Sequence, residues 1–183
     1  MAIMSRLRRS WMRGGKACLL LWLPACTIPE VTLEPIDATV DPVASHLLDV
    51  RWPCTGEGCA DVEAVARLAN SIRGEAGRVG VPVSLMIGVL MVENPWLDTV
   101  AVSYAGAVGL YQTMPIHDDA WQECPDDPRS VSGSVCRGAE VLADFMARHD
   151  ITDALLRYNG CRQLRCAGYP LKVMSEADAF GGD

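Results

Sequence analysis

The amino-acid sequence predicts a mainly α-helical domain whose loops are stapled by disulfides. Apolar residues recur at the spacing of a helix in several segments between residues 61 and 158, and no segment alternates convincingly between apolar and polar residues. Cysteines beyond residue 26 are even in number and form sequence-local pairs. The length of 183 residues fits one domain with appended segments.

The first 25 residues have the composition of an export signal. Basic residues without any acid precede the nearly continuous apolar run Ala17–Ala25. This run is shorter than the ~20 apolar residues that a membrane-spanning helix needs, so we do not expect a permanent transmembrane anchor. It ends in LPAC, residues 23–26, which resembles the bacterial lipoprotein signal, where cleavage precedes a lipid-carrying cysteine. Residues 1–25 are therefore predicted to be a lipoprotein-type signal peptide, with Cys26 as the lipidation candidate.

Two alternatives remain for this end of the chain: ordinary secretion with Cys26 free, and translation from Met4 or Met12. After export, the protein is expected in the periplasm or cell envelope, and a lipidated form would reach a membrane surface through its acyl chains. Residues 26–53 contain several prolines, scattered acids and no sustained period. This composition is typical of a tether.

Charge argues against one class of partner. Without residues 1–25 the chain keeps 11 basic and 23 acidic residues, a net charge of −12. Affinity for nucleic acid comes from Lys and Arg side chains that neutralise phosphates. We therefore expect no binding to nucleic acid.

An even number of cysteines in an exported chain indicates disulfides. The sequence allows many connectivities, and local spacing favours three pairs, the first of which would staple a turn that opens the folded domain. These pairs are Cys54–Cys59, Cys124–Cys136 and Cys161–Cys166. A zinc site is the weaker interpretation, because there is no CxxC motif and His46, His117 and His149 lie at no ligand spacing. We expect no metal site.

The first helix is predicted to begin after Asp61, whose side chain can accept hydrogen bonds from first-turn amides. Apolar residues then recur at helical spacing from Val62 to Ile72, and Gly77 and Gly80 end the helix. The second predicted helix, Pro82 to Glu93, is apolar nearly all round, which is typical of a buried helix. Proline is tolerated in its first turn.

The second helix should end beside Glu93, because Pro95 disfavours helical geometry at Asn94. A third helical stretch is predicted to begin near Val108 and to resume after Pro115 through Trp121. The same periodicity predicts a fourth helix over Ser134–Arg148 and a fifth over Thr152–Tyr158.

Glu93 is the candidate catalytic residue. A carboxyl group at the end of a buried helix loses hydration, and this loss raises its pKa. A raised pKa suits an acid that must protonate a leaving oxygen in glycoside cleavage at neutral pH. The alternative is a helix-end glutamate that simply reaches solvent.

The loop after Glu93 favours the catalytic interpretation. Its small residues, among them Gly106 and Gly109, would admit a ring, and Ser103 and Gln112 offer directional hydrogen bonds. A loop whose glycines serve only turns is the alternative.

Other acids are weaker candidates. Glu75 is the best rival of Glu93, but Arg73 and Arg78 lie nearby and an ion-paired surface acid is the simpler interpretation. Asp98 lies in a stretch predicted to be flexible. The last two acids, Asp118 and Asp119, are predicted to be exposed on a helix.

Four segments of the sequence resemble motifs of one known protein family. AVSYAGAVGLYQTMP, residues 101–115, closely resembles the AVSxAGAxGLMQxMP segment of lytic transglycosylases with the soluble-transglycosylase domain, members of the lysozyme-like superfamily. Gly138–Leu142 resembles that family's GxxYL helix, residues 155–160 resemble its AxxAYNxG motif, and Tyr169–Val173 is similar to its closing YxxxV element. The resemblance covers about residues 61–175.

The resemblance implies a lysozyme-like helical fold for residues 54–176, with residues 177–183 left as a flexible tail. Glu93 matches the catalytic acid/base. Tyr158 matches the tyrosine that holds the catalytic carboxyl group, and the adjacent Asn159 is expected to brace that corner. The substrate-binding positions of the family are matched by Ser103, Gly109, Gln112, Tyr158 and Asn159.

Four features depart from the family pattern and leave the shape of the cleft open. Asn94 follows Glu93 where the family usually has Ser. The spacing from Glu93 to Ser103 is one residue longer than is common, and Tyr111 replaces the usual Met. Arg157 replaces a small residue and adds a charge that we expect to face solvent.

The resemblance implies a reaction that needs only one carboxyl group. Glu93 would protonate the oxygen between N-acetylmuramic acid and N-acetylglucosamine, with help from the substrate's acetamido group. It would then take a proton from the C6 hydroxyl group, which closes onto C1 as a 1,6-anhydro product. The sequence thus predicts a monomeric, cofactor-free peptidoglycan lytic transglycosylase. The alternatives are a hydrolase on the same scaffold and a non-catalytic peptidoglycan-binding lipoprotein.

Overall fold

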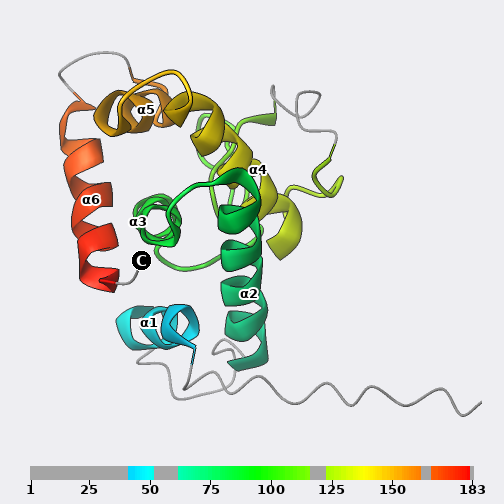
Figure 1. The fold of residues 1–183 in the computed structure, drawn as a ribbon. Coiled ribbons are helices and arrows are strands. Elements are labelled where there is room, and N and C mark those ends of the chain that lie inside the picture. Colours follow the sequence, from blue (N-terminus) through cyan, green and yellow to red (C-terminus); the bar gives the residue numbers. More distant parts are fainter. Residues whose placement is uncertain (1–40, 52–61, 116–122, 162–165, 182–183) are drawn as a thin grey trace, which may run out of the picture. The chain divides into compact units, whose positions relative to one another are not determined.

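The computed structural model describes residues 41–51, 62–115, 123–161 and 166–181. Six helices form within these ranges, which contain isolated β-bridges but no longer strand (Figure 1). The prediction of a mainly helical fold is therefore confirmed. The helices are α1 (Pro42–Arg51), α2 (Val62–Val79), α3 (Val83–Glu93), α4 (Val131–Met146), α5 (Ile151–Tyr158) and α6 (Gly168–Phe180).

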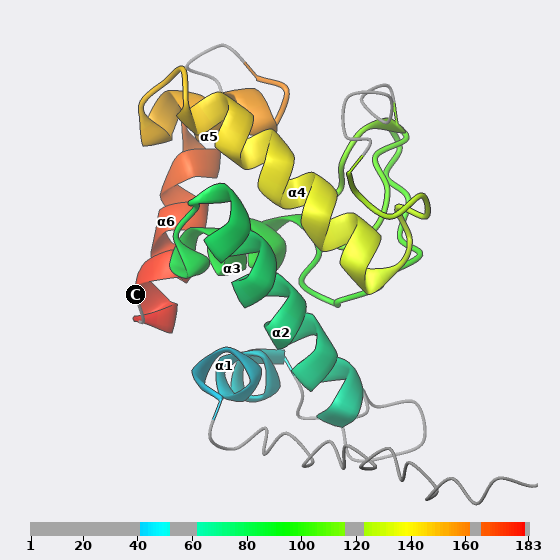
Figure 2. The ribbon, with the colours of Figure 1, turned by 45° about the vertical axis from the view of Figure 1, so that its right-hand side comes forward.

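Helix α3 lies at the centre of the fold, between α2 and α6 (Figures 1 and 2). Its residues from Leu85 to Met91 are all buried, as expected for a helix that is apolar on every face. The helix ends at Glu93, and the amide of Asn94 closes the last turn on the Leu90 carbonyl oxygen at 2.9 Å. The predicted end of this helix is confirmed, and its first residue is Val83, one position after the predicted Pro82.

Helix α2 presents a narrow buried stripe to the core, running from Val65 to Ala76. Gly77 lies inside the helix, and the chain leaves it at Gly80, whose φ of +74° favours glycine. Helices α4 and α5 confirm the fourth and fifth predictions. Each begins behind a side chain that accepts a first-turn amide hydrogen bond, Ser130 for α4 and Asp150 for α5.

The tether predicted over residues 26–53 is wrong for its last part, which forms α1. Val43 and Leu47 are fully buried in the core. Asp41 accepts hydrogen bonds from the first-turn amides of α1 and forms an ion pair with Arg73 of α2. This helix is short and has prolines nearby, so the sequence shows no clear helical period of apolar residues. Its stability comes from packing on α2.

The flexible tail predicted over residues 177–183 is also wrong for its first part, because α6 continues to Phe180. Helix α6 crosses α3 at very short range, and in Figure 1 α3 is seen end-on beside α6. A Cβ atom added at Gly88 would lie 2.4 Å from the Val173 carbonyl oxygen and 3.2 Å from the Ala177 Cβ atom. Glycine is therefore required at the point where the two helices cross.

The helix predicted to begin near Val108 is absent over residues 108–115. This segment forms turns with β-bridges from Val108 to Val102 and to Thr113. Gly109 and Gln112 adopt positive φ values of +77° and +46°, which a right-handed helix does not allow. The predicted continuation through Trp121 lies outside the described residues.

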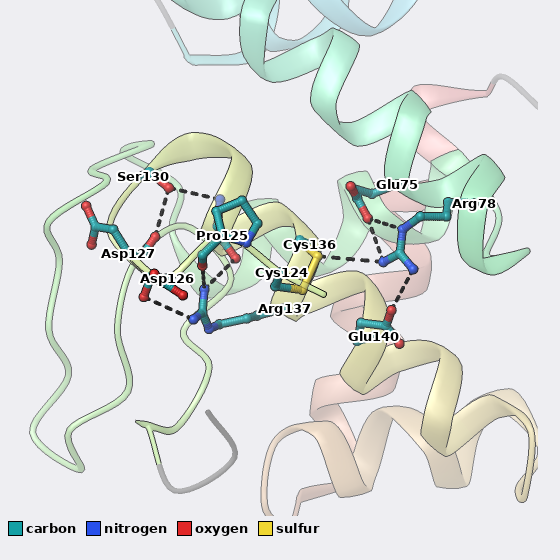
Figure 3. Close-up of a disulfide and its surroundings, with 11 residues drawn as sticks. Glu75, Arg78, Cys124, Pro125, Asp126, Asp127, Ser130, Cys136, Arg137 and Glu140 are labelled. Carbon is teal, nitrogen blue, oxygen red and sulfur yellow. Dashed lines mark hydrogen bonds and ion pairs between the residues drawn. A yellow bond between two sulfur atoms is a disulfide. The ribbon is translucent and has the colours of Figure 1, made fainter. Parts of the chain in front are cut away.

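Two of the three predicted disulfides are confirmed, Cys124–Cys136 and Cys161–Cys166. Next to the first, Arg137 of α4 donates hydrogen bonds to the Pro125 and Asp126 carbonyl oxygens, at 2.6 and 3.1 Å (Figure 3). Disulfide and guanidinium group together attach the loop before α4 to that helix. The pair Cys54–Cys59, Cys26 and the signal segment fall outside the described residues. Within the described ranges, no helix combines the length and apolarity needed to cross a bilayer.

Candidate active site

Glu93 is a half-buried carboxyl group at the C-terminal end of α3. The Tyr169 hydroxyl group, at the start of α6, donates a hydrogen bond to its Oε1 atom at 2.6 Å. Burial raises the pKa of Glu93 above its ordinary value of 4.5, although the Tyr169 hydrogen bond acts in the opposite direction. The upward shift predicted from the sequence is confirmed.

The tyrosine that holds this carboxyl group is Tyr169, and the prediction of Tyr158 for this role is wrong. The Tyr158 hydroxyl group instead donates to the Tyr111 carbonyl oxygen at 2.7 Å. Tyr158 still lies in the field of the carboxylate: burial raises its pKa first, and the charge of Glu93 adds to the shift. Burial also raises the pKa of Tyr169, so its hydroxyl group stays protonated and can donate.

An open groove of about 510 Å³ borders Glu93. It lies between the end of α3 and the loop after it, so it collects three of the residues proposed from sequence: Glu93, Ser103 and Gln112. A somewhat larger hollow of about 560 Å³ lies at the corner of α4 and α5, away from these residues. The groove beside Glu93 is the better candidate for an active site, because it is bordered by a carboxyl group with a raised pKa. Its lining is completed by Asn94, Pro95, Trp96, Asp98, Ala101 and Val102.

Asn94, the first departure from the family pattern, organises the loop beside the groove. Its buried side-chain amide donates to the Asp98 carbonyl oxygen at 2.6 Å and to the Gly109 carbonyl oxygen at 3.2 Å. Its Oδ1 atom accepts from the Asp98 amide at 3.1 Å. One side chain thus joins the turn after α3 to the loop of small residues.

Ser103 and Gln112 both hold the loop together as well as lining the groove. Ser103 Oγ accepts from the Ala107 amide at 3.0 Å, and Gln112 Nε2 donates to the Gly109 carbonyl oxygen at 2.8 Å. The Ser103 hydroxyl proton and Gln112 Oε1 take no part in these bonds. Both could therefore hydrogen-bond a polar ligand in the groove.

Gly109 lies where there is no space for a side chain between the loop and α4. A Cβ atom there would lie 2.6 Å from the Pro128 carbonyl oxygen and 2.7 Å from Ser134 Oγ, so the loop approaches α4 closely at this point. An approach of Gly109 to a sugar stays a prediction. Asn159 is exposed just beyond α5, where its amide donates to the Leu155 carbonyl oxygen at 3.1 Å. It does not line the groove, and its bracing role also stays a prediction.

Tyr111, a further departure from the family, is fully buried behind the groove. Its hydroxyl group donates to the Met86 carbonyl oxygen at 3.2 Å. Its ring lies against Gly138 of α4, where an added Cβ atom would lie 2.4 Å from the ring. The large ring and the glycine therefore complement each other. Arg157 is half-buried, and its Nε atom is buried with no hydrogen-bond partner among the described residues. That its charge faces solvent stays a prediction.

The structure describes two of the other acidic candidates, Glu75 and Asp98. Glu75 accepts from Arg78 at 2.7 Å, and Arg78 also pairs with Glu140 of α4 at 2.7 Å, beside the Cys124–Cys136 disulfide (Figure 3). Glu75 is thus the ion-paired acid that the sequence predicted. Asp98 is exposed on the groove, and its Oδ1 atom accepts from the Val100 amide at 3.0 Å. Asp118 and Asp119 lie outside the described residues.

Two residues at the site were not predicted to lie there, Tyr169 and Trp96. Tyr169 carries a signal in the sequence, because it opens the YxxxV element, whereas Trp96 carries none. Comparison of the chain with protein-family models, with curated proteins and with solved structures found no match. In the part of the chain that the structure describes, no three His, Cys, Asp or Glu side chains are placed to hold one metal ion.

Proposed function

We propose that this chain is a peptidoglycan lytic transglycosylase with a lysozyme-like helical domain, in which Glu93 is the acid/base. The observation that carries the proposal is the half-buried Glu93 carboxyl group, whose pKa is raised by burial, at the edge of an open groove. The AVSYAGAVGLYQTMP segment supplies one wall of that groove. Export, and attachment to a membrane through Cys26, belong to the same proposal.

In the proposed reaction Glu93 first donates a proton and later accepts one. Protonated Glu93 gives its proton to the glycosidic oxygen while the bond from C1 to that oxygen breaks. The substrate's acetamido group stabilises C1, and the Tyr169 hydroxyl group donates to the new carboxylate. Glu93 then removes the proton of the C6 hydroxyl group as O6 bonds to C1. Glu93 ends protonated again, and no water is consumed.

A hydrolase is the second candidate, and the position of Asp98 on the groove favours it. Most glycosidases use two carboxyl groups, one of which activates water or attacks the sugar. In such an enzyme Asp98 would be the second group. The AVSYAGAVGLYQTMP segment, which lines the same groove, supports the transglycosylase over this candidate.

Mass spectrometry of the products separates the candidates. We expect digestion of purified peptidoglycan sacculi to release muropeptides that end in 1,6-anhydromuramic acid. Products heavier by one water would identify the hydrolase and overturn the proposal. Retention of the protein on sacculi with no soluble product would indicate a non-catalytic peptidoglycan-binding protein.

The Tyr169 hydroxyl group should set the upper pH limit of activity. Its hydrogen bond favours the charged form of Glu93 and so lowers the pKa of that carboxyl group. In Tyr169→Phe the pKa of Glu93 should rise further. We therefore expect the alkaline limb of the kcat/KM profile to move to higher pH, because the acid keeps its proton longer.

Tyr158→Phe is the matched control for this experiment. It removes a neighbouring buried hydroxyl group that is bonded to the Tyr111 carbonyl oxygen instead of to Glu93. It should leave the alkaline limb in place and lower thermal stability. A shift of the limb in Tyr158→Phe, with none in Tyr169→Phe, would reverse the assignment of the two tyrosines.

A further inference from the structure

Trp96 is the most unusual side chain on the groove, because it is a large aromatic group that is 80% exposed. Val102 lines the same groove and is also exposed, and Val100 and Tyr104 are exposed on the same loop. Single exposed apolar residues are ordinary on soluble proteins. A group of them beside polar side chains and a carboxyl group of raised pKa indicates a binding surface.

The geometry of the turn that contains Trp96 leaves its side chain exposed to solvent. Leu97, the next residue, has a φ of +53°, a left-handed geometry that is uncommon for a leucine. Its side chain packs against the core, and its amide donates to the Asn94 carbonyl oxygen at 3.0 Å. The buried Asn94 side chain closes the turn on Asp98. Trp96 is therefore held in solvent by a fixed turn.

The chemistry of the groove selects the kind of ligand. None of the described residues that line it is basic, whereas Glu93 and Asp98 are acids, so a phosphate or another anionic group would be repelled. A β-1,4-linked N-acetylglucosamine ring has equatorial polar substituents and two faces of axial C–H bonds. Such a ring matches a flat indole on its face, and Ser103 and Gln112 can hydrogen-bond its edge.

We infer that Trp96 is a stacking platform for a pyranose ring of the glycan strand, next to the bond that Glu93 cleaves. This inference rests on the proposed function and adds to it the side chain that positions the strand. The platform binds any β-1,4-linked N-acetylated sugar, because it contacts the ring face and not the lactyl or peptide group.

The test measures binding apart from cleavage. The full chain carrying Glu93→Gln is titrated calorimetrically with the β-1,4-linked tetramer of N-acetylglucosamine. Adding Trp96→Ala should raise Kd about tenfold, which corresponds to about 1.4 kcal/mol, because the indole face against the sugar ring is lost. Trp96→Phe keeps an aromatic face and should recover most of the affinity. Trp96→Leu keeps apolar area without that face and should bind as weakly as Trp96→Ala.

Two controls complete the design. Ile151→Ala removes an exposed apolar side chain on α5, outside the groove, and should leave Kd unchanged. Saturation with the tetramer should change the tryptophan fluorescence of the Glu93→Gln chain, and this change should be absent when Trp96→Phe is added. The chain has five tryptophans, so the difference between the two titrations isolates Trp96.

Several outcomes would overturn the inference. Equal Kd values for the parent and Trp96→Ala would remove Trp96 from the site, and so would a parent that fails to bind the tetramer. Tight binding by Trp96→Leu would exclude an aromatic platform. A fluorescence change with phosphatidylglycerol vesicles but not with the tetramer would indicate a membrane contact. If the wild type nevertheless releases anhydro products, the proposed function stands. If tetramer binding depends on Trp96 but sacculi yield no product, only the function fails.

Discussion

Glu93→Gln should abolish the release of anhydromuropeptides from purified sacculi. The glutamine amide occupies the same space and can still accept the Tyr169 hydrogen bond, but it has no acidic proton to give to the glycosidic oxygen. Loss of general acid catalysis costs about 10²- to 10⁴-fold in rate, and here the same group also serves as the base. The measurement is the rate of product formation followed by mass spectrometry.

Asp98→Asn is the matched control, because it neutralises the other acid on the groove. A transglycosylase that needs one carboxyl group should keep most of its activity in this variant. Loss of activity in both variants would favour the two-carboxyl hydrolase. Full activity in Glu93→Gln would remove Glu93 from the mechanism altogether.

Thermal unfolding against pH shows whether Glu93→Gln keeps its fold. The pKa of Glu93 is higher in the folded chain than its ordinary value of 4.5, so the folded state holds a proton that the unfolded chain has already lost. The free energy of unfolding therefore falls as pH rises above that value. Glutamine does not titrate and escapes this fall. The Tm of the variant, relative to the wild type, should rise as the pH is raised above 4.5.

Gly88→Ala should cause a large loss of stability, although it only replaces one hydrogen atom by a methyl group. Its Cβ atom would lie 2.4 Å from the Val173 carbonyl oxygen, which belongs to the backbone of α6 and cannot rotate away. The two helices must separate or shift. Overpacking of this kind costs about 1–3 kcal/mol in the free energy of unfolding. The fall in Tm measures it.

The displacement of α6 should also reach the active site. Tyr169 lies near the start of the same helix, and a shift of α6 would lengthen its hydrogen bond to Glu93. We therefore expect Gly88→Ala to move the alkaline limb of the activity profile in the same direction as Tyr169→Phe. A destabilised variant with an unchanged profile would show that the two ends of α6 respond independently.

Gly74→Ala is the control for Gly88→Ala. Gly74 is exposed on α2, and a Cβ atom there would have no neighbour within 4 Å. Alanine should stabilise this position by about 0.5–1 kcal/mol, because it restricts the unfolded chain more than glycine does. If both variants gained stability, the close contact between α3 and α6 would be refuted.

Local features of the sequence predicted the end of α3 correctly. The apolar run predicted burial, Pro95 predicted the helix end, and the two together predicted a carboxyl group whose pKa is raised by burial. Cysteine spacing likewise predicted Cys124–Cys136 and Cys161–Cys166. These predictions succeeded because each depends on residues that are close along the chain.

Other predictions failed where distant contacts decide the structure. Helix α1 has too few residues to be stable alone, and it forms because Val43 and Leu47 pack into the core. The segment after Val108 has apolar residues at helical spacing, yet it forms turns, in which Tyr111 is held by hydrogen bonds to Met86 of α3 and Ser134 of α4. Sequence periodicity cannot separate these cases, because burial stabilises helices and turns alike.

The sequence by itself determined a helical chain, a glutamate at the end of its buried helix, and the disulfides that close its loops. Only the tertiary structure decided which tyrosine reaches that glutamate. Tyr169 is 76 residues away along the chain, and it arrives because Gly88 lets α6 lie against α3. Tertiary contacts also decide that Asn94 folds inward, where its side chain bonds the Gly109 carbonyl oxygen, and that Trp96 stays exposed. Helix ends follow from local backbone sterics, whereas the partner of a side chain depends on which surfaces bury each other.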